Sequence, residues 1–458
     1  MSTNHNLSKF LLSVFRLAIL IVFPYALSAQ GTDTLSLQQC IALAVKNNQS
    51  LQNKRLDELI EQARIDETKA DLYPQAKIKG SYQYYLDVPT SLVPASAFGG
   101  PAGEYTFTQF QVSQNITTSF DVAWQVYNPA ILAALKISKL SKTMSTVATK
   151  DKLEAIIYDV SATYLNVQIN ELQASLTRSN IANLKKNLEL TTQLFNQGLA
   201  LRSDLDNLQV SIVNLETVLN NQLNGISQLN YLLKVYIGLP IDFALKVEKY
   251  RPENDSSPTL TSLDTSIYQK RSAYLSLQQA GDLLHLERES IRAGFRPSVN
   301  LIGSFGYSGL NPKLQAFTAY NNRWYPTNLI QLNVEIPVFD GLKKRNQLIK
   351  NQLESQQNHN SLTALANTLK MEQRNAINDF NRYLQDLEYQ SKNLELANKL
   401  YTQKLLEYQN SLASLNDMIA VENTLKSAQT NYLNVLVKLK LAELDLKKAN
   451  GQLINNNQ

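Results

Sequence analysis

The stretch Asn115–Val126, NITTSFDVAWQV, alternates apolar and polar side chains along its whole length. Phe120 and Trp124 fall on one side of an extended chain, and Asp121 falls on the other. A period of two predicts a β-strand with one apolar and one polar face. The same pattern returns, less cleanly in the last two, in the segments 330–338, 76–85 and 298–308. The sequence therefore predicts two strands in each half of the chain.

The length and the aromatic content of these strands favour a membrane sheet. Segments of about ten residues suit transmembrane β-strands, with lipid on one face and water on the other. Aromatic residues near strand ends are typical of a membrane interface; the candidates are Trp124, Tyr127, Trp324 and Tyr325. A soluble, half-buried sheet is the alternative that alternation alone leaves open. In lipid, four strands cannot close, so two copies giving eight strands or three giving twelve are expected.

An internal duplication organises the chain. Three motifs of the first half return in the same order in the second half, which is the signature of one repeated unit. The matched pairs are Leu72–Ala76 with Phe295–Val299, Val126–Pro129 with Val338–Gly341, and Phe195–Ala200 with Tyr408–Ala413.

Long helices fill most of the remaining chain. Residues 130–196 and 342–409 contain no proline and almost no glycine, and a helix of that length would run about 100 Å. Apolar residues at a spacing of three to four in 205–219 and 425–446 predict coiled-coil packing. The predicted fold class is mainly α with a membrane β-barrel part, built from a duplicated helix–strand–strand–helix unit. A plain solvated coiled coil would leave the strands unexplained.

The first residues read as a secretory signal. Lys9 and Arg16 precede the short apolar run Leu17–Phe23, and small residues follow up to Ala29. The run is too short to span a bilayer, which favours a cleaved signal over the alternative, a membrane anchor.

The predicted organisation follows from the signal and the duplication. The segments are a signal peptide at 1–29, a first repeat at 30–240, a linker at 241–261, a second repeat at 262–448 and a C-terminal tail at 449–458.

Charge and reactive residues argue against several classes of protein. The net charge is +5, and two of these charges leave with the signal, so nucleic acid is not an expected partner. His285 and His359 stand among polar residues of helical stretches, and Cys40 is the single cysteine. No catalytic or phosphate-binding motif is present. We therefore expect no catalytic residues, no metal site and no cofactor, and an unrecognised hydrolase is the weakest alternative.

Several motifs resemble those of the TolC-like outer membrane factor family, also called outer membrane efflux proteins. The opening Leu35–Asn48 resembles the family's first helix, and Ile237–Pro240 resembles its link between the halves. Tyr73-Pro74 and Arg296-Pro297 resemble its helix-to-strand breaks. No single motif is very specific, but their order covers the chain after the signal.

The resemblance implies a homotrimer whose twelve strands form one barrel in the outer membrane, continued by an α-helical tunnel into the periplasm. It implies two protein partners, a periplasmic adaptor (membrane fusion) protein and an inner-membrane pump or transporter, besides outer-membrane lipid. The expected function is the channel of a tripartite efflux or type I secretion system, conducting substrate passively. The alternative is a structural coiled-coil protein of the envelope without a pore.

By the same resemblance, the turns at the tunnel tip form the gate and the adaptor docking zone. The matching residues are Phe195, Gly198, Arg202, Asp204, Tyr408, Ser411 and Asp417. The chain departs from the family pattern at Ala420, where a second acidic residue would be expected. For Asp204 and Asp417 the alternative is N-terminal capping of the following helix, and both roles can coexist.

Overall fold

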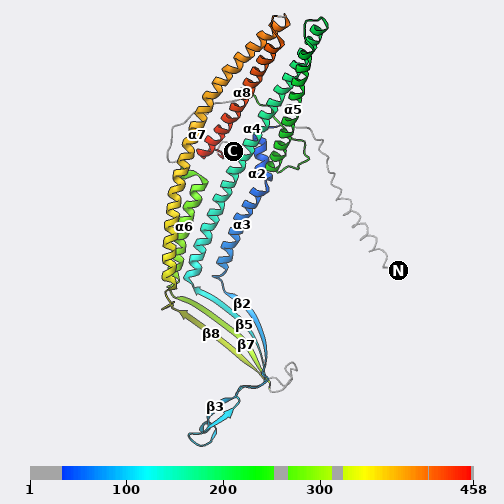
Figure 1. Cartoon of the computed structure of the whole chain (residues 1–458). Helices are drawn as coiled ribbons and strands as arrows, with labels where there is room; N and C mark the ends of the chain where they lie inside the picture. The colour runs from blue at the N-terminus through cyan, green and yellow to red at the C-terminus, as the bar shows by residue number, and fades with distance from the viewer. Residues whose placement is uncertain (1–33, 252–266, 312–322, 411, 455–458) are drawn as a thin grey trace, which may run out of the picture.

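The computed structural model describes residues 34–251, 267–311, 323–410 and 412–454. Figure 1 shows an elongated molecule in which long helices occupy one end, a curved sheet follows, and a small hairpin lies at the far end. The predicted signal peptide lies outside the described residues.

Four antiparallel strands form the sheet in the order β2-β5-β7-β8. Their bounds are Gln75–Tyr84 for β2, Gln114–Tyr127 for β5, Ser298–Asn311 for β7 and Arg323–Glu335 for β8. The central pair β5 and β7 joins the two halves of the chain, with Phe120 opposite Phe305. β2 and β8 are the edges of this four-stranded sheet.

The two faces of the sheet differ in polarity. On one face the register aligns apolar side chains, and Ile78 is 80% exposed and Ile330 72% exposed. On the other face Asp121 accepts a hydrogen bond from Ser304 (2.6 Å) and pairs with Lys79 (2.8 Å). The polar face thus pairs Asp121 with Ser304 and Lys79, whereas the apolar face is left exposed by the single chain.

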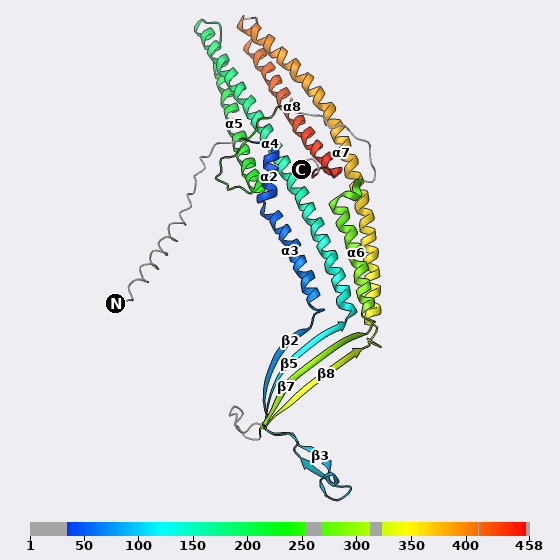
Figure 2. The ribbon, with the colours of Figure 1, turned by 180° about the vertical axis from the view of Figure 1, so that it is seen from behind.

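The helices repeat in the same order in both halves. In each half, one helix leads into the strands, a very long helix leaves them, and a third returns antiparallel to it (Figures 1 and 2). The bounds are α3 Gln49–Ala70, α4 Pro129–Asn196 and α5 Arg202–Ile237, then α6 Ser272–Ala293, α7 Lys343–Gln409 and α8 Leu415–Ala449. With 68 and 67 residues, α4 and α7 confirm the predicted long helices.

Short elements complete the middle of the molecule. The helix α2 (Leu37–Asn47) precedes α3, and β1 (Thr34–Leu35) pairs in parallel with β6 (Lys246–Val247). A 3-10 turn η4 (Ile267–Lys270) precedes α6.

The two joints between sheet and long helix are built differently. Asn128 caps α4, its side chain accepting a hydrogen bond from the Ala130 amide, and a proline opens the helix. At the start of α7, Gly341 and Leu342 both adopt a φ of 67°. Asp340 accepts a hydrogen bond from the Lys344 amide there. A positive φ is uncommon for a leucine and stores strain of about 1–3 kcal/mol.

The main core lies where α2 packs on α4 and α5. Cys40, Val160, Leu233 and Ile237 are fully or almost fully buried in it. Burial raises the pKa of the Cys40 thiol to about 11. A second cluster, near the helical tips, joins all four long helices of the two halves.

The structure corrects two boundaries of the predicted sheet. β8 begins at Arg323 and ends at Glu335, so it starts earlier than the predicted segment 330–338 and excludes Val338. Pro326 weakened the alternation signal, but an edge strand tolerates a proline because one of its sides has no partner strand.

A hairpin of the first half was missed by the sequence analysis. It consists of β3 (Ser91–Pro94) and β4 (Tyr105–Thr108), joined through η2 (Ala95–Phe98), and it extends beyond the sheet, away from the helices (Figure 2).

Within the described residues, no helix combines the length and the apolar composition needed to cross a bilayer.

Candidate functional site at the helical tips

Two helical hairpins, α4/α5 and α7/α8, end in turns at the same end of the molecule (Figure 1). In the first turn Gly198 has a φ of 73°, a conformation that suits glycine. Ser411 of the second turn lies outside the described residues. The structure therefore brings the two predicted turns to one region, far from the sheet.

Both predicted tip aspartates cap helices. The Asp204 carboxylate accepts a hydrogen bond from the Leu201 amide at 2.9 Å, at the start of α5. The Asp417 carboxylate accepts hydrogen bonds from the amide and the hydroxyl of Ser414, at 3.2 and 2.7 Å. The Ser414 hydroxyl holds the pKa of Asp417 below its ordinary value. Asp204 and Asp417 thus cap helices, as the alternative interpretation expected. Both also lie beside the turns where the resemblance places the gate.

The neighbouring Arg202 makes a local ion pair. Its Nε lies 3.2 Å from Asp206, one helical turn along α5, and both side chains are largely exposed. An exposed pair of this kind contributes little to stability. Arg202 is therefore on the surface of the first tip.

The two predicted tip aromatics have different environments. Phe195 is 37% exposed, whereas Tyr408 is 6% exposed. The Tyr408 hydroxyl lies 2.7 Å from the Thr191 hydroxyl, which also donates to the Asn187 carbonyl at 2.8 Å. Since Thr191 belongs to α4 and Tyr408 to α7, this hydrogen bond links the two hairpins. The sequence analysis did not identify Thr191.

The four predicted interface aromatics lie at the two ends of the sheet. Trp124 and Tyr127 stand at the end that adjoins the helices, and Trp324 and Tyr325 stand at the opposite end. Trp124 also donates a hydrogen bond from Nε1 to the Leu72 carbonyl at 3.0 Å. The two pairs therefore mark two levels along the strands.

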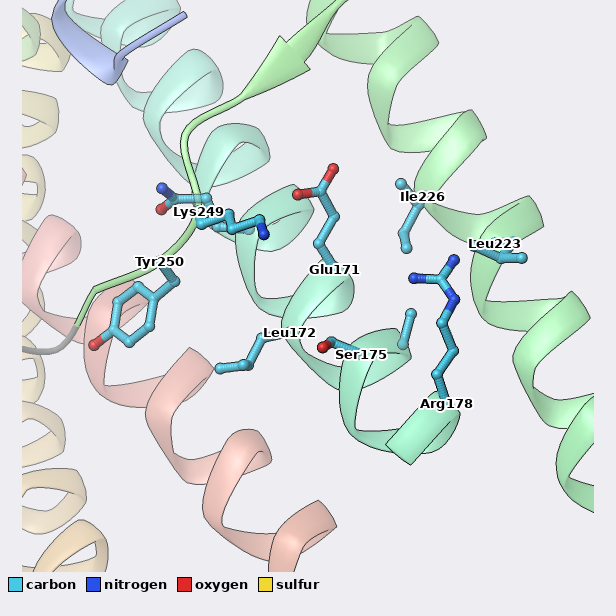
Figure 3. A pocket seen from close by; sticks show the side chains of 10 residues that line it. Glu171, Leu172, Ser175, Arg178, Leu223, Ile226, Lys249 and Tyr250 are labelled. Atoms are coloured by element: carbon cyan, nitrogen blue, oxygen red, sulfur yellow. The ribbon is translucent and has the colours of Figure 1, made fainter. Parts of the chain in front are cut away.

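A pocket of about 340 Å³ lies between α4, α5 and the segment that follows β6 (Figure 3). Leu172, Leu223 and Ile226 give it an apolar wall, and Glu171 and Lys249 stand at its rim. Burial raises the pKa of Glu171. Among the described residues no cluster of three or more His, Cys, Asp or Glu side chains is placed to hold a metal ion.

Comparisons with known proteins were made in sequence and in fold. No protein-family model matches the sequence. The chain is 23% identical over 448 residues to outer membrane protein TolC of Escherichia coli strain K12, covering 93% of this chain and 85% of TolC.

Solved structures agree with this likeness. The fold is similar to that of CusC, with a TM-score of 0.73 at 17% identity, over 90% of this chain and 91% of CusC. It is also similar to the MtrE outer membrane channel of Neisseria gonorrhoeae, with a TM-score of 0.72 at 17% identity, over 91% of this chain and 89% of MtrE. The resemblance inferred from the motifs is confirmed: this outer-membrane chain is similar to TolC in sequence and to outer-membrane channels in fold.

Proposed function

We propose that the chain is the outer-membrane channel of a tripartite efflux or type I secretion system. In this role it conducts substrate passively from a periplasmic adaptor and an inner-membrane transporter to the outside. The observation that carries the proposal is the sheet: an exposed apolar face, a hydrogen-bonded polar face, and direct continuation into α4 and α7. Lipid would cover the first face and water the second.

The edges of the sheet support assembly into a closed ring. β2 and β8 each pair on one side only within the described chain, and unpaired backbone groups cost several kcal/mol each in lipid. Joining the β8 edge of one copy to the β2 edge of the next removes both edges. Three copies would give twelve strands, the homotrimer that the resemblance implies.

The exposed aromatics fit such a ring. Trp124 and Tyr127 would lie at the periplasmic interface and Trp324 at the outer interface, whereas Tyr325 pairs with Ser308 on the polar face and would face water. The missed hairpin β3–β4 would then project from the outer surface. A structural envelope coiled coil explains α4 and α7 but gives no reason for an exposed apolar sheet face.

At the opposite end, the two turns are proposed to be the gate and the adaptor docking zone. Gly198, Arg202 and Phe195 present the exposed surface of the first turn, and Tyr408 holds the hairpins together. Asp204, Asp417 and Ser411 complete the proposed tip. The relatives are channel proteins, and we propose that this chain likewise has no catalytic role.

Fractionation followed by bilayer recordings tests the proposal. The mature protein is expected in the outer-membrane fraction, to require detergent for extraction, and to produce discrete conductance steps in planar bilayers. A protein that is monomeric and soluble without detergent, or an oligomer that gives no conductance, would contradict it.

A further inference from the structure

A buried glutamate lies in the packed seam between the two helical hairpins. We define the inter-hairpin seam by its buried side chains from α4, α7 and α8, among them Leu184, Tyr401, Met418 and Leu425. Glu422 of α8 is 5% exposed within this region. It shares a helix face with Met418 and Leu425, so its carboxyl is directed into the seam rather than into water.

The polar partners of Glu422 are incomplete. Its Oε1 atom is buried and receives no hydrogen bond. Lys426, one turn further along α8, brings Nζ to 3.3 Å from that oxygen as an ion pair outside hydrogen-bonding geometry. Among the described residues, Lys426 is the one charged group that acts appreciably on Glu422.

Among the described residues, the polar groups of α7 and α4 near Glu422 are uncharged. From α7, the Tyr401 hydroxyl lies close enough to feel the charge of Glu422. From α4, Asn187 approaches Tyr401, and its Nδ2 atom is buried without a hydrogen-bond acceptor. Within the part of the chain that the structure describes, Lys426 is thus the one cation that acts on the Glu422 carboxylate.

Protonation changes the free energy of this arrangement. A buried carboxylate with incomplete hydrogen bonding is costly, whereas the neutral acid is tolerated. Burial raises the pKa of Glu422, and Lys426 offsets this in part. Because the packed seam binds the proton more tightly than an opened seam, packing is favoured at low pH. Stability is lost as pH rises from the ordinary glutamate range through the raised pKa.

We propose that Glu422 couples closure of the helical tips to protonation: the neutral carboxyl keeps the α4/α5 and α7/α8 hairpins packed, and the carboxylate loosens them. The inference rests on the proposed function in one respect, because it takes the tips to be the gate. The coupling itself is a property of the seam and can be measured apart from conduction.

The test measures the distance between the two tips as a function of pH. Single cysteines replacing the exposed Leu199 and Leu412 carry spin labels, in full-length oligomers mixed with an excess of unlabelled chain. In the parent protein the distance distribution is expected to shift to longer values as the pH rises above the ordinary glutamate range. In the Glu422→Gln variant it is expected to stay short throughout.

Two further variants keep the test decisive. Glu407→Gln removes a half-buried glutamate that, unlike Glu422, is fully paired, with Lys404 and Gln403 near the same tip, and it is expected to behave like the parent. Lys426→Met removes the cation and is expected to move the transition to higher pH, which supports the coupling even if Glu422→Gln fails to assemble.

A transition that persists unchanged in Glu422→Gln, or a parent protein with no transition, overturns the coupling. Bilayer recordings on the same samples separate this from the channel proposal. Conduction without a pH-dependent distance refutes only the coupling, and a pH-dependent distance without conduction refutes only the channel.

Discussion

At the scale of single residues, the hydrogen bond between Tyr408 and Thr191 is the clearest contact between the hairpins. Tyr408→Phe removes the hydroxyl and leaves Thr191 bonded only to the Asn187 carbonyl. A lost hydrogen bond of this kind costs about 0.5–1.5 kcal/mol. We therefore expect faster amide hydrogen exchange in the last turns of α4 and α7, read by mass spectrometry.

The matched control is Tyr389→Phe, which removes an exposed hydroxyl that accepts a hydrogen bond from Gln385 within α7. It should leave exchange at the tips unchanged. Equal exchange in both variants would show that the Tyr408 hydroxyl does not hold the hairpins together.

The cap of α8 has a testable pH dependence. Because Ser414 holds the pKa of Asp417 low, this contact stabilises the helix start above the ordinary aspartate range and is lost as pH falls through the lowered pKa. In Ser414→Ala the pKa of Asp417 is expected to rise, measured by carbon NMR of labelled aspartate. Thr424→Ala, whose hydroxyl bonds a backbone carbonyl instead, should leave the pKa unchanged; an equal rise there would refute the assignment.

The sequence predicted the positions of the tip aspartates but not the residues that they face. Asp204 and Asp417 stood out because they match the tip aspartates of the family that the chain resembles, in segments next to recognisable turns. Thr191 and Glu422 depend on packing between helices that are far apart in the chain. One signal was available: Glu422 falls four residues after Met418 and three before Leu425, on the apolar face of a helix.

At the scale of secondary-structure elements, the pairing of β5 with β7 holds the two repeats together in the sheet. The strands approach closely at Gly306, where a Cβ would collide with the Thr118 carbonyl and with Ser119. Gly306→Ala is expected to destabilise the pairing by about 1–3 kcal/mol. The oligomer should then dissociate at a lower temperature on denaturing gels.

Gly80→Ala is the control on the edge strand β2, because a Cβ there meets nothing within 4 Å. The interpretation fails if both variants dissociate at the same temperature as the parent.

The elements themselves were largely predictable. Long runs without proline gave α4 and α7 almost to the residue, and alternation gave β5. The hairpin β3–β4 was missed because its strands have only four residues each, too few for a clear period of two. The early start of β8 was missed because Pro326 and Asn328 interrupt the alternation.

At the scale of the whole molecule, the apolar face of the sheet decides whether the chain enters lipid. Ile330→Lys places a charge on that face near the middle of β8, at a cost of about 2–4 kcal/mol in lipid. We expect less assembled protein in the outer-membrane fraction.

Gln331→Lys makes the same change one residue later, on the polar face, and should assemble normally. If the two variants assemble equally well, the exposed face is not a lipid contact. From the sequence we expect copies to associate if the sheet lies in lipid, since four strands leave two edges. Their number rests on the resemblance, because edge pairing alone allows two copies or three.

The joint at Leu342 makes the two repeats mechanically unequal. The helix α4 begins with a proline, whose fixed φ already matches a helical backbone, so the start of the first hairpin carries no such strain. The second hairpin is mounted on Leu342, held at a positive φ. A rotation that returned Leu342 to a negative φ would relieve this backbone strain, so strain favours movement of the joint in one direction. The duplicated unit thus gives two long helices of similar length, and of these α7 begins at a strained backbone residue whereas α4 begins at a proline.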